Sequence, residues 1–188
     1  MSRCQTCGEH TVTDALASQC RTCAALRVAF GEDVDHGVES IARGYVDALC
    51  WTQRDVAASA DDDTDGDQTL RDLGYGYDEL HPDTRDRIIA ELTDVVTAHP
   101  LAVRMYGAAR TFSFGDGNVW EHFGHDYLLT RDGHGAGFWD RGLGELGDYL
   151  TSIADAAGEH EELWRDLADG ERRLTDGNDT PRPTGEVD

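Results

Sequence analysis

The 188-residue sequence contains no lysine, and all 16 of its basic residues are arginine. They stand against 38 acidic residues, 26 of them aspartate, and the formal net charge is −22. A charge this large makes a compact chain repel itself, unless salt screens the repulsion by shortening the Debye length to about 3 Å at 1 M. We therefore expect adaptation to a salt-rich cytoplasm, as in extreme halophiles. A high-GC coding bias, which also replaces lysine by arginine, is the alternative explanation.

Long apolar runs are also missing. No stretch approaches the roughly 20 apolar residues of a membrane span, and no apolar signal core follows the first charged residues. We expect a cytoplasmic protein with no membrane partner. Its negative body should not hold phosphate backbones or anionic lipids without a separate basic patch. Hydrophobic residues make up 39 % of the chain, enough for one modest core.

Four of the five cysteines form a C-x2-C-x12-C-x2-C array near the N-terminus: Cys4, Cys7, Cys20 and Cys23. Each C-x2-C turn can direct two thiolates at one tetrahedral ion, so the array predicts a closed structural Zn²⁺ site. Two disulfides are disfavoured in a reducing cytoplasm, and a redox motif is disfavoured because no βαβ pattern surrounds the pairs. Cys50 lies in an apolar segment and is interpreted as a buried small hydrophobe.

The cysteine array is the only region without the acidic bias. Residues 1–30 carry three arginines against two acidic residues, a net charge of +1, whereas residues 31–188 carry −23. We interpret residues 1–30 as a zinc-ribbon-like module that docks a protein partner or stabilises the N-terminus. Nucleic-acid binding through Arg3, Arg21 and Arg27 is the alternative, although salt weakens phosphate contacts steeply.

Apolar residues recur every three or four positions in three segments, which predicts three amphipathic helices. These segments are residues 36–58, 82–98 and 143–157. Leu101, Met105 and Ala108 indicate a further helical stretch after Pro100. Residues 175–188 are rich in Pro, Gly, Asp and Thr and are interpreted as a disordered acidic tail.

The acidic segment 61–72 has the residue spacing of an EF-hand loop. Gln68 stands where such a loop has an apolar residue, and no clear helix follows. A solvated acidic loop is therefore the preferred interpretation, with calcium binding as the alternative.

Asp132-Gly133 lies between two runs that can be extended, and this pair is a strong signal for a two-residue hairpin turn. The resulting register would pair His125 with Asp140 and Arg131 with His134 on one face. In an enzyme, His125 would be a general base oriented by Asp140, with Arg131 and His134 as anion binders. The alternatives are structural cross-strand pairs and a metal site formed by His122, His125 and His134.

The same segment carries a resemblance. Residues 124–141 read G-H-D-Y-L-L-T-R-D-G-H-G-A-G-F-W-D-R, which resembles the signature G-H-D-F-W-L-T-R-N-G-H-G-A-G-F-W-D of small, mostly uncharacterised proteins encoded by tailed phages. The similarity extends weakly over about residues 40–160, and it leaves the cysteine array outside. Tyr127, Leu128 and Asp132 are mild departures. The resemblance implies a viral origin, and together with the composition it indicates a virus of a halophilic archaeon.

The sequence as a whole predicts an α+β fold with an N-terminal zinc knuckle pair and about three helices packed on a small antiparallel sheet centred on the hairpin. The predicted parts are the module at 1–30, an α+β domain at 36–174 and the tail at 175–188. The expected function is that of an accessory viral zinc-binding protein acting through protein contacts. A hydrolase or nucleotide-processing enzyme using the hairpin is the first alternative, and nucleic-acid binding through the module is the second.

Overall fold

The computed structural model describes residues 2–8, 11–12, 19–54, 68–110, 118–166 and 172–179. Its helices are α1 (Arg21–Phe30), α2 (Gly37–Thr52), α3 (Pro82–Ala98), α4 (Pro100–Ala109), α5 (Val119–Arg131) and α6 (Glu145–Ala157). Short 3-10 helices are η1 (Gly31–Asp35), η3 (Tyr77–Glu79) and η4 (Phe138–Asp140). Antiparallel strand pairs join β1 (Ser2–Arg3) to β2 (Thr11–Val12) and β3 (Trp164–Asp166) to β4 (Arg173–Thr175).

This arrangement is compatible with the predicted α+β class, but three helices is an undercount. The described residues form six helices, and the paired strands are only two or three residues long. The segments predicted as helices correspond to α2, α3 and α6, and the stretch after Pro100 is α4. None of the described helices has the length and apolarity needed to cross a membrane.

The predicted hairpin at 124–141 is wrong, because its first half is helix α5. Asp132-Gly133 ends this helix: the N–H of Gly133 donates to the carbonyl of Thr130, and the N–H of His134 donates to that of Leu129. This pair of bonds is the Schellman arrangement, which requires a positive φ at the residue after the cap, and Gly133 has a φ of 65°. A positive-φ glycine serves a hairpin turn and a helix end equally well, so the local sequence did not separate them.

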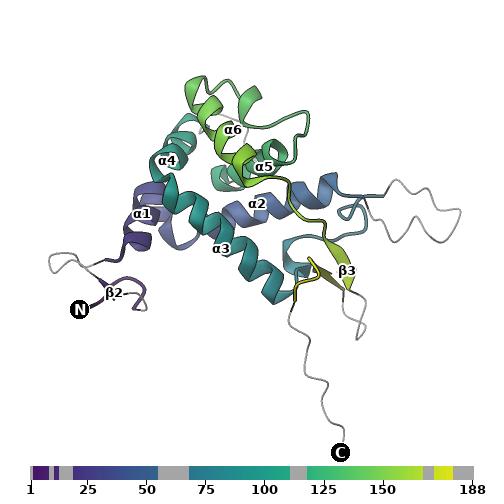
Figure 1. The fold of residues 1–188 in the computed structure, drawn as a ribbon, viewed down its shortest axis with the longest axis horizontal. Coiled ribbons are helices and arrows are strands. Elements are labelled where there is room, and N and C mark those ends of the chain that lie inside the picture. The colour runs from purple at the N-terminus through teal and green to yellow at the C-terminus, as the bar shows by residue number, and fades with distance from the viewer. Residues whose placement is uncertain are drawn as a thin grey trace, which may run out of the picture.

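The centre of the molecule is the crossing of α2 and α5. A Cβ atom on Gly44 would lie 1.9 Å from the carbonyl oxygen of Glu121, and one on Gly124 would lie 1.9 Å from that of Ile41. The missing side chains therefore let the two backbones touch. Figure 1 shows α2 in the middle of the bundle, with α3 and α5 packed against it.

An aromatic cluster fills the space beside this crossing. The rings of Phe123 and Tyr106 meet edge to face at 5.1 Å, and the Phe138 ring lies 5.2 Å from that of Phe123. Phe138 belongs to η4, so this contact docks the loop that follows α5 back onto the helix. Phe30 at the end of α1 meets Trp120 of α5 edge to face at 4.9 Å, which ties α1 into the same core.

The C-terminal strand β4 is attached to the start of α3. Leu174 forms an isolated parallel bridge with Leu80, and Arg87 binds the carboxylates of Asp176 and Asp179. The first residues of the predicted tail, up to Asp179, are thus held against the helical body. Residues 180–188 of that tail, and residues 61–67 of the possible calcium loop, lie outside the described part of the chain.

Candidate functional site

The four cysteines of the N-terminal array lie together. One sulfur atom from each of Cys4, Cys7, Cys20 and Cys23 is within 4.8 Å of the other three. None of the five cysteines, all of which the structure describes, is in a disulfide. Three of the clustered side chains are buried and Cys7 is half-buried. The cluster can therefore hold a metal ion, as the spacing predicts.

Backbone N–H groups support the cluster. The N–H of Cys20 donates to the Cys4 sulfur at 3.3 Å, and the N–H of Cys23 donates to the Cys20 sulfur at 3.4 Å. The second bond is also the N-cap of α1, so the helix begins at the cluster. Both bonds stabilise thiolate charge, and so does the positive end of the helix dipole.

Two of the four thiols have pKa values shifted in opposite directions. Backbone N–H groups of Cys7 and Cys20 lower the pKa of Cys4 to about 7. Burial raises the pKa of Cys23 above its usual range, and the adjacent Cys20 sulfur adds to the effect. A buried thiol of this kind loses its proton when a cation takes its place. Four sulfur donors around one point suit Zn²⁺, which binds soft ligands tetrahedrally at about 2.3 Å.

The four residues proposed for catalysis do not form one site. Arg131 points to the carboxyl end of α6, where it donates to the carbonyl of Gly158, to the Tyr45 hydroxyl at 2.7 Å and to Glu91. Asp140 accepts the N–H of Gly137 at 3.1 Å inside η4. The backbone of His134 completes the end of α5. The expected pairs of His125 with Asp140 and of Arg131 with His134 required the register of the hairpin. Because His125 and Arg131 belong to helix α5, that register does not exist.

His125 faces a different place, a cleft of about 690 Å³ between α2, α5 and η3. Its ring stacks on that of Trp51, with centroids 6.0 Å apart. Burial lowers the pKa of His125 below its usual value, and the carboxylates of Asp126 and Asp47 oppose this shift. His122 also lines the cleft, and its Nε2 is buried with no hydrogen-bond partner among the residues that the structure describes.

Asp126 is a buried carboxylate in the wall of this cleft. It accepts the Tyr106 hydroxyl at 2.8 Å, and the guanidinium of Arg141 donates to its other oxygen at 2.8–2.9 Å. Arg110 lies 3.9 Å from the same group. The hairpin hypothesis missed this network, although a helical reading of the same residues places His122, His125 and Asp126 on one face at spacings of three and four.

The positive charges of the cleft are already compensated. Arg43 pairs with Glu39 and Asp78 at 3.1 and 3.2 Å, and Arg141 pairs with Asp126. An anionic ligand would have to displace a carboxylate of the chain itself. The geometry therefore supports a structural use of the buried pair more strongly than an anion-binding one.

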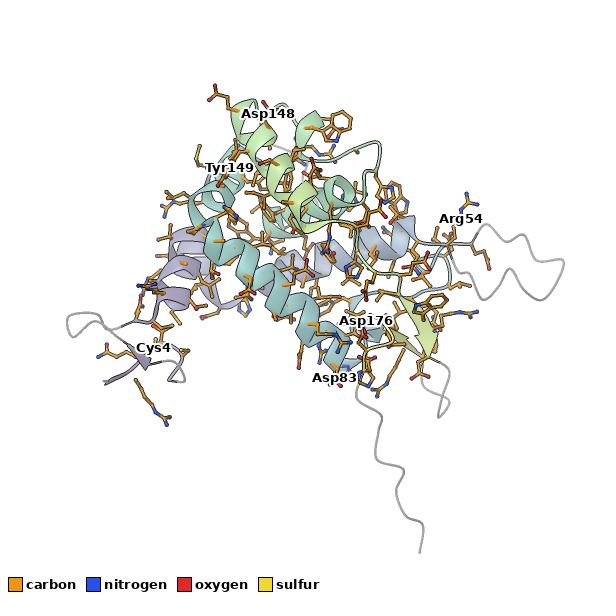
Figure 2. All side chains as sticks on the ribbon, viewed as in Figure 1. Cys4, Arg54, Asp83, Asp148, Tyr149 and Asp176 are labelled. Carbon is orange, nitrogen blue, oxygen red and sulfur yellow. The ribbon has the colours of Figure 1, made fainter. Side chains whose placement is uncertain are left out.

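A second group of potential ligands lies at the start of α3, where donor atoms of His81, Asp83 and Asp179 are within 4.8 Å of one another. Figure 2 labels Asp83 at this end of the helix, where the N–H of Asp176 donates to the Thr84 hydroxyl at 3.4 Å. Thr84 and Arg87 donate to Asp179 at 2.9 and 2.7 Å. The group is thus explained as a cap in which Arg87 supplies the positive charge.

In comparisons with known proteins, no family model, no curated protein and no solved structure matches this chain.

Proposed function

We propose that this chain is a zinc-binding accessory protein of a virus of a halophilic archaeon, and that it acts by contact with another protein. The observation that carries the proposal is the cluster of four buried or half-buried thiols at the start of α1. The composition and the resemblance of residues 124–141 to the phage signature support the viral, salt-adapted origin.

Zinc would link the N-terminal ribbon to the helical body. Cys20 and Cys23 stand at the start of α1, and the other end of this helix inserts Phe30 into the core. The carbonyl of Val28 in α1 accepts a bond from Arg104 of α4 at 3.4 Å. Binding of the ion by four thiolates would stabilise α1 and, through it, the position of α4, because metal binding and folding are coupled at such sites.

The enzyme alternative has less support, because its four residues lie at separate places and the cleft arginines are paired. Nucleic-acid binding by the module is also less supported. It would depend on three arginines, and Arg3 already donates to the carbonyl of Gly8 at 3.5 Å.

Elemental analysis of the purified protein tests the proposal. We expect about one zinc per chain, as four thiolates close one tetrahedral shell. The double variant Cys4→Ser, Cys20→Ser should lose the metal and unfold at a lower temperature. Cys50→Ala is the matched control: burial raises the pKa of Cys50 to about 12, it lies in α2 outside the cluster, and its removal should leave the zinc content unchanged.

Three results would contradict the proposal. They are a purified protein without zinc, a double variant that keeps it, and a thermal transition that a chelator leaves unchanged. Iron in place of zinc would contradict the identity of the ion while leaving the four-thiol site intact.

A further inference from the structure

The geometry points to a docking groove between α4 and α6 that takes an amphipathic helix from a partner protein, with a basic flank turned toward α6. This inference rests on the proposed role in protein contact, and it places that contact on the helical body instead of on the zinc module.

The groove is a hollow of about 450 Å³ lined mainly by apolar side chains. Leu101 and Met105 lie one turn apart on α4 and are 65 % and 56 % exposed. Leu146 and Tyr149 face them from α6. Isolated exposed apolar residues are ordinary on a protein surface. Here three exposed ones, Leu101, Met105 and Tyr149, line one hollow together with the half-buried Leu146 on a chain of charge −22, which marks a surface built for contact.

A polar contact joins the two walls of the groove. The Tyr149 hydroxyl and the Nδ1 atom of His99 are 2.9 Å apart, and the two rings meet edge to face at 5.8 Å. This bond holds α6 against the junction of α3 and α4. In Figure 1, α4 and α6 lie side by side at one end of the bundle. Two neighbouring helical walls lined with apolar side chains suit a helix whose apolar positions recur at i, i+3, i+4 and i+7.

The charges of the two walls differ. Helix α6 carries Glu145, Asp148 and Asp155 and no basic residue, whereas α4 carries Arg104 and no acidic one. Asp148 lies beside Tyr149 (Figure 2). A partner helix with arginines along the flank that faces α6 would complement this wall. A second copy of the chain is disfavoured as occupant because it would bring two bodies of charge −22 together.

An apolar groove also suits the salt-rich medium that the composition indicates. At molar salt, interactions between exposed charges more than about 3 Å apart are largely screened, whereas burial of apolar surface persists and strengthens in some salts. The partner's apolar ridge would therefore supply most of the affinity there, and its basic flank would contribute mainly at lower salt or where charges come into direct contact.

Binding of a synthetic peptide at 1 M KCl (Debye length about 3 Å), followed by fluorescence anisotropy, tests the inference. The labelled peptide is an amphipathic helix with leucines on one face and arginines along one flank. The wild-type chain should bind it, and the double variant Leu101→Asp, Met105→Asp should bind about 10-fold or more weakly, as expected when central apolar anchors are lost. Both replaced side chains are more than half exposed, so the fold should tolerate the change.

Trp164→Asp is the matched control. Trp164 is a similarly exposed large residue, 49 % accessible, and it lies in β3 outside the groove. It should leave the affinity unchanged, and a peptide of the same composition in scrambled order should not bind. Glu145→Gln with Asp148→Asn should weaken binding at low salt. The same double variant should have little effect at 1 M KCl, because a Debye length of about 3 Å screens the acidic charges of α6.

The inference is overturned if the wild type does not bind the peptide, if the groove variant binds like the wild type, if the control loses affinity equally, or if the scrambled peptide binds as well. Sedimentation of the protein alone tests the other occupant. A dimer that the Leu101→Asp, Met105→Asp variant abolishes would show that a second copy fills the groove.

Zinc content is measured on the same samples. Peptide binding without zinc contradicts the proposed metal alone, and zinc without peptide binding contradicts the groove alone.

Discussion

His160 is a partly buried imidazole on the segment that follows α6. Its Nδ1 lies 2.8 Å from the Tyr45 hydroxyl, and that hydroxyl accepts a bond from Arg131 at 2.7 Å. The Nε2 atom of His160 is buried, and no described residue forms a hydrogen bond with it. Burial, with a smaller contribution from the neighbouring Arg131 guanidinium, lowers the pKa of His160 to about 4. The neutral ring is therefore the form that the fold accepts.

This shift predicts a loss of stability in mild acid. Between pH 6.5 and about 4 the unfolded chain binds a proton at His160 that the folded chain does not, so the free energy of unfolding should fall by up to about 1.4 kcal/mol per pH unit. Above pH 6.5 this contribution vanishes. Urea denaturation from pH 7.5 to 5 should show the slope in the wild type.

The contribution of His160 to this slope is isolated by comparing His160→Asn with His36→Asn. His36 is the matched control because it is exposed at the start of α2. The first variant should flatten the slope relative to the wild type, and the second should keep it. An unchanged slope in His160→Asn would assign the acid sensitivity to other groups.

At the scale of elements, the residues of segment 124–141 together fix helix α5 and the loop that follows it. Gly124 allows the crossing with α2, and Asp126 holds Arg141. Thr130 donates its hydroxyl to the carbonyl of Asp126 at 2.7 Å and accepts the N–H of Phe138 at 2.9 Å. Most residues of this segment thus build α5, its end and the loop that returns to it.

The α2–α5 crossing predicts that Gly124→Ala is strongly destabilising. The added methyl group would meet backbone atoms of Ile41 and Tyr45 that cannot move independently of α2. We expect a decrease of about 1–3 kcal/mol or more in the free energy of unfolding, the usual range for overpacking, measured by urea denaturation at molar KCl.

Gly135→Ala is the control for this change, because a Cβ atom there would meet no described residue within 4 Å other than its chain neighbours, and its φ lies outside the left-handed region. Its stability should stay within about 0.5 kcal/mol of the wild type, as at ordinary surface positions. Equal effects of the two substitutions would show that the crossing is not as tight as the structure indicates.

For the whole molecule, the dominant property is charge. Several acidic side chains of the described surface are exposed, and the exposed ion pairs, such as Arg43 with Glu39 and Arg71 with Asp47, compensate only a few of them. Such pairs contribute about 0–1 kcal/mol each. Repulsion among the remaining acidic groups should therefore control how stability depends on salt.

Raising KCl from about 0.1 M to 1 M, which shortens the Debye length from about 10 Å to 3 Å, should raise the melting temperature of the zinc-loaded protein. An uncharged osmolyte that does not screen charge should give a smaller rise at the same concentration. A melting temperature that is constant or falls with KCl would contradict adaptation to salt and favour coding bias as the source of the missing lysine.

How far the sequence predicts the structure differs from element to element. Helix α3 was predicted with its correct bounds because Pro82 starts it and its apolar period is regular. Helix α5 was missed because its residues are apolar or aromatic on several sides, as expected of a helix buried in the core, and because Gly133 suits a helix end and a hairpin turn alike. Helix α1 was hidden behind the cysteine array that caps it.

The sequence by itself determined the four-thiol cluster, since two C-x2-C turns can close on one point whatever the rest of the chain does, and the acidic surface, which is a property of composition. Only the tertiary structure decided where His125, Arg131 and Asp126 lie. Their partners are far away along the chain: Trp51 for His125, Glu91 and Gly158 for Arg131, and Tyr106 for Asp126. Contacts of that range depend on how α2 and α5 cross, and the crossing is set by backbone approach at two glycines that no local pattern reveals.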